Sequence, residues 1–325
     1  MRKVATLICS MLSIMLLVSA CSNGSTSSEK SGSKKYVAMI AKGFSQSYWV
    51  SVNQGAKDAA KKYNVELSFT GPDNDSQVDK QATMVQNAVD KSPDAIAIAP
   101  LDEAALTPAI ANAKSANIPL FAFDTAFTKK GITKSAVYTD NYKAGALAAE
   151  NFVRLTGGHG SYAIIAHSQT DATSTERRDG FIDYMKKNAP EMVMAGTVQY
   201  CQADQAISEN LTNSVLQANP GLSGIFTTNE ASATGAASSV EAAQKAGKKI
   251  VLVGFDSGAA QQQYIRDGVV AGSVSQNPYQ IGYKTIENVA KYLKGESVGG
   301  DIDSGSIWYD SSNINDPKVK EALYQ

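Results

Sequence analysis

ANIPLFAFDT at residues 116–125 is echoed by AGKKIVLVGFDS at residues 246–257. In each stretch the end of a helical pattern leads into an apolar run, and the run closes on Phe, Asp and a hydroxyl residue. The segments just upstream, PDAIAI at 93–98 and GLSGIF at 221–226, also correspond. A repeat at this spacing predicts two lobes of similar topology instead of one enlarged sheet.

Outward from the repeat, short apolar runs alternate with amphipathic stretches along the whole chain after residue 35. We expect strands at residues 36–41, 65–70, 95–99, 119–123, 135–138, 161–166, 193–199, 224–227, 249–254 and 269–275. We expect helices at residues 49–63, 78–91, 103–116, 145–156, 178–188, 206–218, 231–246 and 280–294. Regular alternation of β-branched strands with helices predicts parallel sheets covered by helices on both faces.

The length of the chain after residue 35 also favours two domains, because it exceeds the usual size of a single core. The predicted fold class is therefore α/β, with two Rossmann-like lobes that are each a parallel sheet flanked by helices and are joined by a three-strand hinge. We expect the first lobe at residues 36–138 plus 277–304. The second lobe is expected at residues 139–276 plus 305–325.

The repeat also carries a pair of carboxylates, Asp124 and Asp256, each at the end of its strand. In open α/β sheets ligands bind beyond the carboxyl ends of the strands. Two facing lobes would bring both carboxylates to one cleft, where they accept hydrogen bonds from sugar hydroxyls. The alternative is that each Asp caps the helix that follows it. The matched pair favours ligand binding.

The N-terminus predicts export. A basic start at residues 1–3 precedes an almost wholly apolar run at residues 4–18, which is short for a membrane span. The segment VSAC at residues 18–21 resembles the lipobox of bacterial lipoproteins, so we expect a signal peptide at residues 1–20 and lipidation of Cys21. The alternative is ordinary cleavage with Cys21 as a bystander. Residues 21–35 are rich in Ser, Gly and Lys and predict a flexible tether.

Composition excludes several other functions. A formal net charge of −1 argues against nucleic-acid binding. With Cys9 in the signal and Cys21 lipidated, Cys201 has no partner for a disulfide. The chain has two histidines and no Cys/His cluster with metal spacing, so we expect no enzyme, no metal and no cofactor. A glycosidase with paired carboxylates is the enzymatic alternative.

A set of motifs in a fixed order then resembles a known family, the periplasmic sugar-binding proteins of the ribose/galactose type, which serve ABC transporters. The motifs are QSYW at residues 46–49, FDT ending at 125, RRDGF at 177–181, TTN ending at 229, GFD ending at 256 and SQN at 275–277. The resemblance implies the type I periplasmic binding protein fold. It implies ligand contacts from Gln46, Tyr48, Trp49, Asp124, Thr125, Arg177, Asn229, Asp256 and Gln276.

Within this resemblance the family's roles apply to particular residues. Tyr48 and Trp49 would stack on a sugar ring, and two bulky rings at a helix opening are awkward to bury otherwise. The forked guanidinium of Arg177 would serve a ring oxygen and a hydroxyl together. Thr125 stands where the family often has Arg, which puts plain ribose specificity in doubt. No aromatic stands at the expected place near Gln202, so we expect either Gln202 or Asp204 to substitute with polar contacts.

A second resemblance leaves the ligand open. AKG at residues 41–43 and FTGP at residues 69–72 are similar to relatives that bind the furanosyl signal autoinducer-2, which use a lysine near Lys42. Lys42 is either such a ligand residue or a surface lysine. We expect a monomeric, lipid-anchored protein outside the cytoplasm that binds a monosaccharide or polyol and delivers it to an ABC permease. The alternatives are a binding protein for autoinducer-2 or a nucleoside, or a sensor component.

Overall fold

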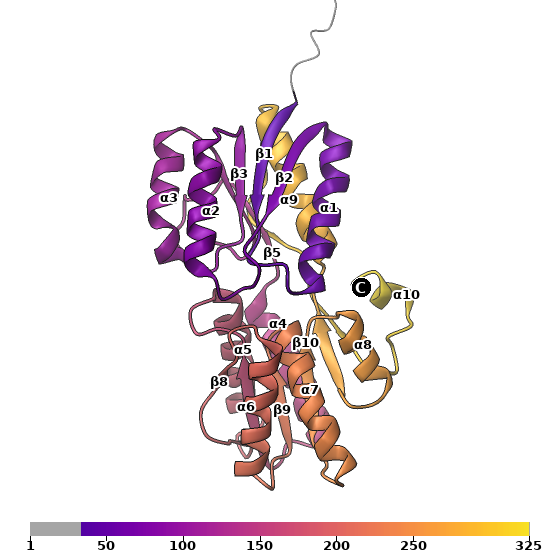
Figure 1. Ribbon diagram of the computed structural model, residues 1–325. Coiled ribbons are helices and arrows are strands. Elements are labelled where there is room, and N and C mark those ends of the chain that lie inside the picture. Colours follow the sequence, from indigo (N-terminus) through magenta and orange to yellow (C-terminus); the bar gives the residue numbers. More distant parts are fainter. Residues whose placement is uncertain (1–33, 325) are drawn as a thin grey trace, which may run out of the picture. The chain divides into compact units, whose positions relative to one another are not determined.

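The structure is a computed structural model, and it describes residues 34–324. Its strands form two sheets, so the chain is an α/β protein of two lobes (Figure 1). The sheet of the first lobe has the order β12-β5-β4-β3-β1-β2. Its strands are β1 (Lys35–Ile40), β2 (Val65–Thr70), β3 (Ala95–Ile98), β4 (Leu120–Asp124), β5 (Ala136–Tyr138) and β12 (Ile302–Asp303).

The sheet of the second lobe has the order β13-β11-β10-β9-β6-β7, with β8 also paired to β6. Its strands are β6 (Ser161–Ala166), β7 (Val193–Met194), β8 (Gln199–Tyr200), β9 (Gly224–Thr227), β10 (Val251–Phe255), β11 (Gly272–Ser275) and β13 (Ile307–Tyr309). Among residues 34–324, every strand pair in the two sheets is parallel except the pair of β11 with β13. The predicted class of parallel sheets flanked by helices is confirmed.

Helices cover both faces of each sheet. The first lobe carries α1 (Ser47–Tyr63), α2 (Val78–Asp90), α3 (Glu103–Ser115) and the late helix α9 (Pro278–Leu293). The second lobe carries α4 (Asn141–Thr156), α5 (Ala172–Asn188), α6 (Gln205–Ala218), α7 (Glu230–Lys245), α8 (Ala259–Arg266) and α10 (Pro317–Lys320).

The side-chain alternation of β1 shows why this arrangement forms. Val37 and Met39 belong to the core under α1 and α9, whereas Ala38 and Ile40 belong to the core under α2 and α3. Successive strand residues point to opposite faces, so an apolar residue at every position requires cover on both sides. The second sheet is likewise buried between two cores.

The chain changes sheet at three places: between β5 and α4, between β11 and α9, and between β12 and β13. We place the lobe boundaries in these connections. The first and third lie together, because Ser304 N donates to the carbonyl of Tyr138 and the hydroxyls of Thr139 and Ser304 are 3.2 Å apart. As a result of the second crossing, α9 packs among elements of the first lobe (Figure 1).

Several sequence-based elements need correction. The strand expected at 193–199 is two short strands, β7 and β8, separated by Gly196 in a left-handed conformation. Helix α5 begins at Ala172 and not at 178, because Asp171 caps it by accepting from Thr173 N. The elements α8, α10, β12 and β13 were not predicted.

The N-terminal predictions fall outside residues 34–324. These are the signal peptide at residues 1–20, the tether and the lipidation of Cys21, which stay predictions. Within the described residues, none of the helices combines the length and apolarity that a membrane span needs.

Candidate functional site

Side chains from both lobes line one small cavity of about 20 Å³ where the strand ends meet. The first lobe contributes residues that follow β1, β2 and β4 or open α1, and the second contributes residues that follow β6, β9, β10 and β11 or lie in α5. The lining residues are Lys42, Gln46, Tyr48, Trp49, Asp75, Asp124, His167, Thr173, Arg177, Asn229, Asp256 and Gln276.

Asp124 and Asp256 face this cavity with the same unusual backbone. Their φ angles are 63° and 78°, in the left-handed region that residues other than Gly seldom adopt. Asp124 ends β4, and Asp256 directly follows β10. Left-handed residues at matched places in two lobes indicate a functional constraint, since such strain persists only where the surroundings impose it.

Asp124 is followed by strand β5, and α8 after Asp256 receives no side-chain cap, so the alternative in which each Asp caps the helix that follows it is wrong. The Asp124 carboxylate accepts from the hydroxyl of Tyr48 at 2.6 Å and from that of Thr125 at 3.0 Å. The Asp256 carboxylate accepts from Gln276 Nε2 at 2.7 Å and from Glu230 N at 3.0 Å. Burial raises the pKa of Asp256, because Arg177 only partly compensates the desolvation.

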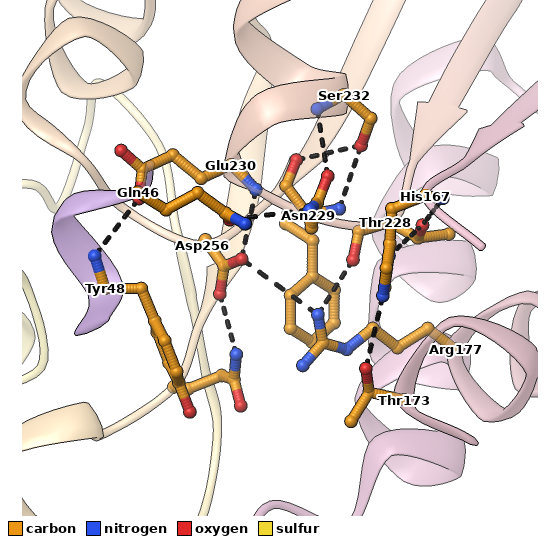
Figure 2. A network of polar contacts seen from close by, with 12 residues as sticks. Gln46, Tyr48, His167, Thr173, Arg177, Thr228, Asn229, Glu230, Ser232 and Asp256 are labelled. Carbon is orange, nitrogen blue, oxygen red and sulfur yellow. Dashed lines mark hydrogen bonds and ion pairs between the residues drawn. The ribbon is translucent and has the colours of Figure 1, made fainter. Parts of the chain in front are cut away.

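Arg177 is fixed in the second lobe by packing and by acceptors. It lies on α5, where helix α4 comes so close that a Cβ at Gly145 would overlap the carbonyl oxygen of Arg177. Its Nε donates to Asn141 Oδ1 at 2.8 Å and its Nη1 to the carbonyl of Thr228 at 2.8 Å. Its Nη1 also lies 4.0 Å from the Asp256 carboxylate, and Figure 2 shows the guanidinium turned toward that group.

The guanidinium of Arg177 also stacks on an aromatic ring, with its central carbon 3.8 Å from the centre of Phe255. A planar cation held by a ring face and two acceptors keeps one orientation. Arg177 is 3% exposed, so its remaining N–H groups are available only to groups inside the site.

Lys42 is buried and is not a surface lysine. It is 2% exposed, and its Nζ lies 3.0 Å from the Asp124 carboxylate and 2.7 Å from that of Asp171. Burial disfavours its charge, but these two carboxylates outweigh burial and raise the pKa of Lys42. Burial likewise opposes ionisation of Asp171, yet Lys42 lowers the pKa of Asp171 to about 2. Because Asp171 belongs to the second lobe, this ion pair joins the lobes.

Tyr48 and Trp49 belong both to the cavity and to the core. They are 3% and 2% exposed and pack edge to face, with ring centres 4.9 Å apart, inside the core under α1. The argument that two rings at a helix opening are awkward to bury is therefore wrong. Stacking of the rings on a sugar stays a prediction.

Across the cavity, the two lobes also meet through amides. Asn229 Nδ2 donates to Gln46 Oε1 at 3.4 Å, as Figure 2 shows. Gln46 Nε2 in turn donates to Asp75 at 3.0 Å. Asn229 presents its own Oδ1 to Ser232 N in a capping box at the start of α7, which fixes its position.

Residues 37–297 match the family described as "Periplasmic binding protein domain". The chain belongs to this family. The match covers most of both lobes, so the strand-end cavity lies inside the matched region.

This periplasmic binding protein is similar to several sugar-binding proteins of bacteria. It is 29% identical to the D-apiose import binding protein of Actinobacillus succinogenes, over 79% of this chain and 83% of that protein. It is 27% identical to the ribose import binding protein of Escherichia coli, over 89% and 95%. A solved structure of an ABC transporter solute binding protein from Agrobacterium vitis with bound D-fucose shares 35% identity, with a TM-score of 0.85, over 89% and 100%.

Two expected ligand residues of the binding protein do not line the cavity. Thr125 is buried and donates its hydroxyl to Asp124, so it supports a lining residue. Gln202 lies in a separate groove of about 350 Å³, on a turn where Gln202 and Ala203 both have φ of 54°. Gln202 does not line the cavity, and its contact with a ligand stays a prediction.

Three lining residues of the binding protein were not predicted: Asp75, His167 and Thr173. Asp75 follows β2 and His167 follows β6, so the rule that ligands gather at strand ends could have found both. Thr173 was not predicted because it lies in the first turn of α5, before the predicted start of that helix. Burial raises the pKa of Asp75 to about 7, and the neighbouring Asp171 and Asp124 add to the effect.

His167 is a neutral hydrogen-bonding group. Burial lowers its pKa to about 3. Its Nδ1 lies 2.8 Å from the hydroxyl of Thr228 and its Nε2 3.2 Å from that of Thr173. Within residues 34–324, no cluster of His, Cys, Asp and Glu has an arrangement that could hold a metal ion. The lining therefore offers hydrogen bonds and fixed charges.

Proposed function

We propose that this chain is the extracytoplasmic substrate-binding component of an ABC transporter and that its cavity binds a monosaccharide or related polyol. The observation that most strongly supports this proposal is the matched pair of carboxylates. Asp124 and Asp256 face one cavity from two sheets, and each is held in a left-handed conformation. Such a pair accepts hydrogen bonds from neighbouring hydroxyls, which a polyol supplies.

The remaining lining also fits a neutral ligand with many hydroxyls. Among the residues that the structure describes, Gln276 Oε1 is buried without a hydrogen-bond partner. A buried acceptor without a partner is costly, and a hydroxyl that donates to it removes the cost. Arg177 and Asn229 offer donors on the same side. A hydroxyl both donates and accepts, so one class of ligand satisfies both kinds of lining group.

The relatives support the same class of ligand. Two of them are named as import binding proteins for D-apiose and for ribose, and one solved structure carries D-fucose. All three names are those of binding proteins, which supports binding without catalysis. In this proposal the ligand bridges both lobes, stabilises their contact and is then released to a permease.

The proposal places the protein at the outer face of a membrane. Residues 1–20 act as a signal peptide, Cys21 carries the lipid, and the tether up to residue 35 spaces the lobes from the bilayer. The composition of these segments supports this arrangement. The lobes act as a monomer.

One observation favours a second ligand class. Lys42 lines the cavity instead of lying at the surface, and it contacts Asp124. This supports the alternative in which the ligand is autoinducer-2 or another furanosyl compound such as a nucleoside. A sensor component that presents its ligand to a receptor would use the same cavity.

A thermal-shift screen of residues 34–325 tests the function. The panel contains D-apiose, ribose, D-fucose, polyols, nucleosides and autoinducer-2. A ligand that binds only the folded state raises the melting temperature by mass action, by several degrees at saturating concentration. A shift with a monosaccharide or polyol supports the proposal. A shift with a nucleoside or autoinducer-2 alone would replace the ligand class, and no shift with any compound would contradict the binding function.

A further inference from the structure

Glu230 opens helix α7 in the second lobe, but its carboxylate contacts the first lobe. Its Oε1 accepts from the hydroxyl of Ser47 at 2.8 Å and from Ser47 N at 3.4 Å. Its Oε2 accepts from Tyr48 N at 3.3 Å, as Figure 2 shows. The carboxylate thus lies at the N-terminus of α1.

Helix α1 lacks a cap from its own lobe. The residue before it, Gln46, makes no side-chain hydrogen bond to the helix, and its first turn contains no acidic residue. The first N–H groups of a helix have no partner within the helix, and a negative charge stabilises this end. Helices α3, α4, α5 and α6 each receive such a bond from an Asp directly before them. Helix α1 receives it from Glu230 of the other lobe.

The backbone N–H of Glu230 contacts the second-lobe side of the cavity. Glu230 N donates to Asp256 Oδ2 at 3.0 Å, and the preceding Asn229 donates to Gln46. A single residue therefore touches the aspartate of the second lobe through its N–H and the opening of α1 through its carboxylate. The Glu230 carboxylate accepts from Tyr48 N, and the hydroxyl of Tyr48 donates to Asp124. The two aspartates are thus linked through Glu230 and Tyr48.

We propose that Glu230 is a positioning residue: its carboxylate caps α1 across the lobes and holds Gln46 and Tyr48 in register with Asp256. It acts through these lining residues and does not line the cavity itself. The inference rests on the proposed function only for its effect on ligand release. The cap itself depends only on contact between the two lobes.

Hydrogen exchange tests the cap directly. In the ligand-free full chain, Glu230→Ala should speed exchange of the Ser47 and Tyr48 amides about tenfold or more, because a hydrogen bond to a charged group is lost. Amides in the middle of α1 should keep their rates. Unchanged exchange at both Ser47 and Tyr48 would overturn the proposal. This measurement needs no ligand, so its outcome stands even if the sugar function fails.

A double-mutant cycle then tests whether the contact controls release. Ser47→Ala removes only the hydroxyl partner, so Glu230→Ala and Ser47→Ala should be non-additive. With D-ribose and D-fucose as probes, Glu230→Ala should raise the dissociation rate constant about tenfold for whichever sugar binds. If both sugars bind too weakly to measure, additive effects of the two substitutions on Tyr48 amide exchange overturn the proposal and non-additive effects support it.

Glu103→Ala is the matched control. Glu103 is also the first residue of its helix, α3, but its carboxylate accepts from Thr128 within the first lobe. This substitution should lower the melting temperature without changing sugar dissociation or exchange at Ser47 and Tyr48. An equal change in dissociation rate constant for Glu103→Ala and Glu230→Ala would show a general loss of stability and would refute the positioning role.

Discussion

Asp124 and Asp256 have the same position in each lobe, the same backbone conformation and different partners. Asp124 is close to Lys42, whereas Asp256 lies 4.0 Å from the nearest Arg177 nitrogen. The pKa of Asp256 is raised by burial. The negative charge of Asp256 is therefore less compensated by a neighbouring cation than that of Asp124. It depends more on hydrogen bonds from other groups in the site.

Asp256→Asn tests this residue. The change keeps the shape but removes the charge and one acceptor, so sugar affinity should fall about a hundredfold while the melting temperature changes little, since a buried charge is also removed. Isothermal titration with the sugar found in the screen measures the affinity. Asp267→Asn, an exposed position, is the control. Near-normal affinity of Asp256→Asn would reject its ligand role.

Asp75 gives a pH-dependent prediction. Its native pKa of about 7 lies above the unfolded value near 3.9, so between about pH 4 and pH 7 the native state binds more protons. Its contribution therefore makes the free energy of unfolding fall as pH rises through this window. Asp75→Asn should melt at a higher temperature than the wild type at pH 8, and the difference should shrink at pH 5.

The control for Asp75 is Asp73, two residues earlier. Asp73 is exposed, and its contact with Lys80 lowers the pKa of its carboxyl. Asp73→Asn should show no stabilisation at pH 8. If Asp75→Asn and the wild type keep the same difference in melting temperature from pH 5 to pH 8, the carboxyl does not titrate in this range.

The sequence alone predicted that Asp124 and Asp256 lie at strand ends, because the same pattern of an apolar run followed by Phe-Asp occurs in both copies of the repeat. The rule that ligands gather at strand ends could also have found Asp75, whereas Thr173 was missed because the start of α5 was predicted too late. For Lys42 the sequence left two interpretations open, and its contacts with Asp124 and Asp171 exclude the surface position, while its contact with a ligand stays a prediction. Burial of a lysine depends on partners that are far apart in the sequence.

At the scale of elements, the long, periodic segments were predicted and the short ones were not. Strand β6 has the predicted bounds, because six apolar or β-compatible residues form a clear run. Strands β12 and β13 have two and three residues, too few to show a period. The start of helix α5 was predicted too late in the chain. Its first two turns are mostly polar, so they show no apolar periodicity.

The contact of α4 with α5 gives a prediction at this scale. Gly145→Ala places a methyl group against the carbonyl oxygen of Arg177, which is backbone and cannot turn away. The helices must separate, so the free energy of unfolding should fall by about 1–3 kcal/mol, as measured by urea denaturation. Sugar affinity should fall as well, because Arg177 moves.

Gly221→Ala is the control, since a Cβ there meets no atom within 4 Å. It should leave both stability and affinity near those of the wild type. A Gly145→Ala variant as stable as the wild type would mean that the helices have room to adjust.

At the scale of the whole molecule, the lobes contact each other through charges and helix ends. Lys42 reaches Asp171, and Glu230 reaches Ser47. These contacts are made by the same strand-end segments that line the cavity, so ligand binding and lobe contact are linked by geometry. The sequence predicted two lobes from the repeat, but not which residues join them, because these pairs lie far apart along the chain.

The lipid anchor is also a prediction for the whole molecule. Full-length wild-type chain expressed in a bacterium should incorporate a labelled fatty acid and sediment with membranes. Cys21→Ala should lose both properties, whereas Cys201→Ala, a buried position, should keep them. Labelling of the Cys21→Ala variant equal to that of the wild type would exclude this cysteine as the lipid site.

The return of α9 to the first lobe has a consequence for the order of folding during synthesis. Ile281, Ile286 and Val289 fill the core under β1, so this core stays incomplete until the ribosome has passed residue 289. Domains usually fold from the N-terminus as they emerge. We therefore expect the first-made lobe to complete its core only after residue 289 has been made, which would favour export of the chain before it has folded.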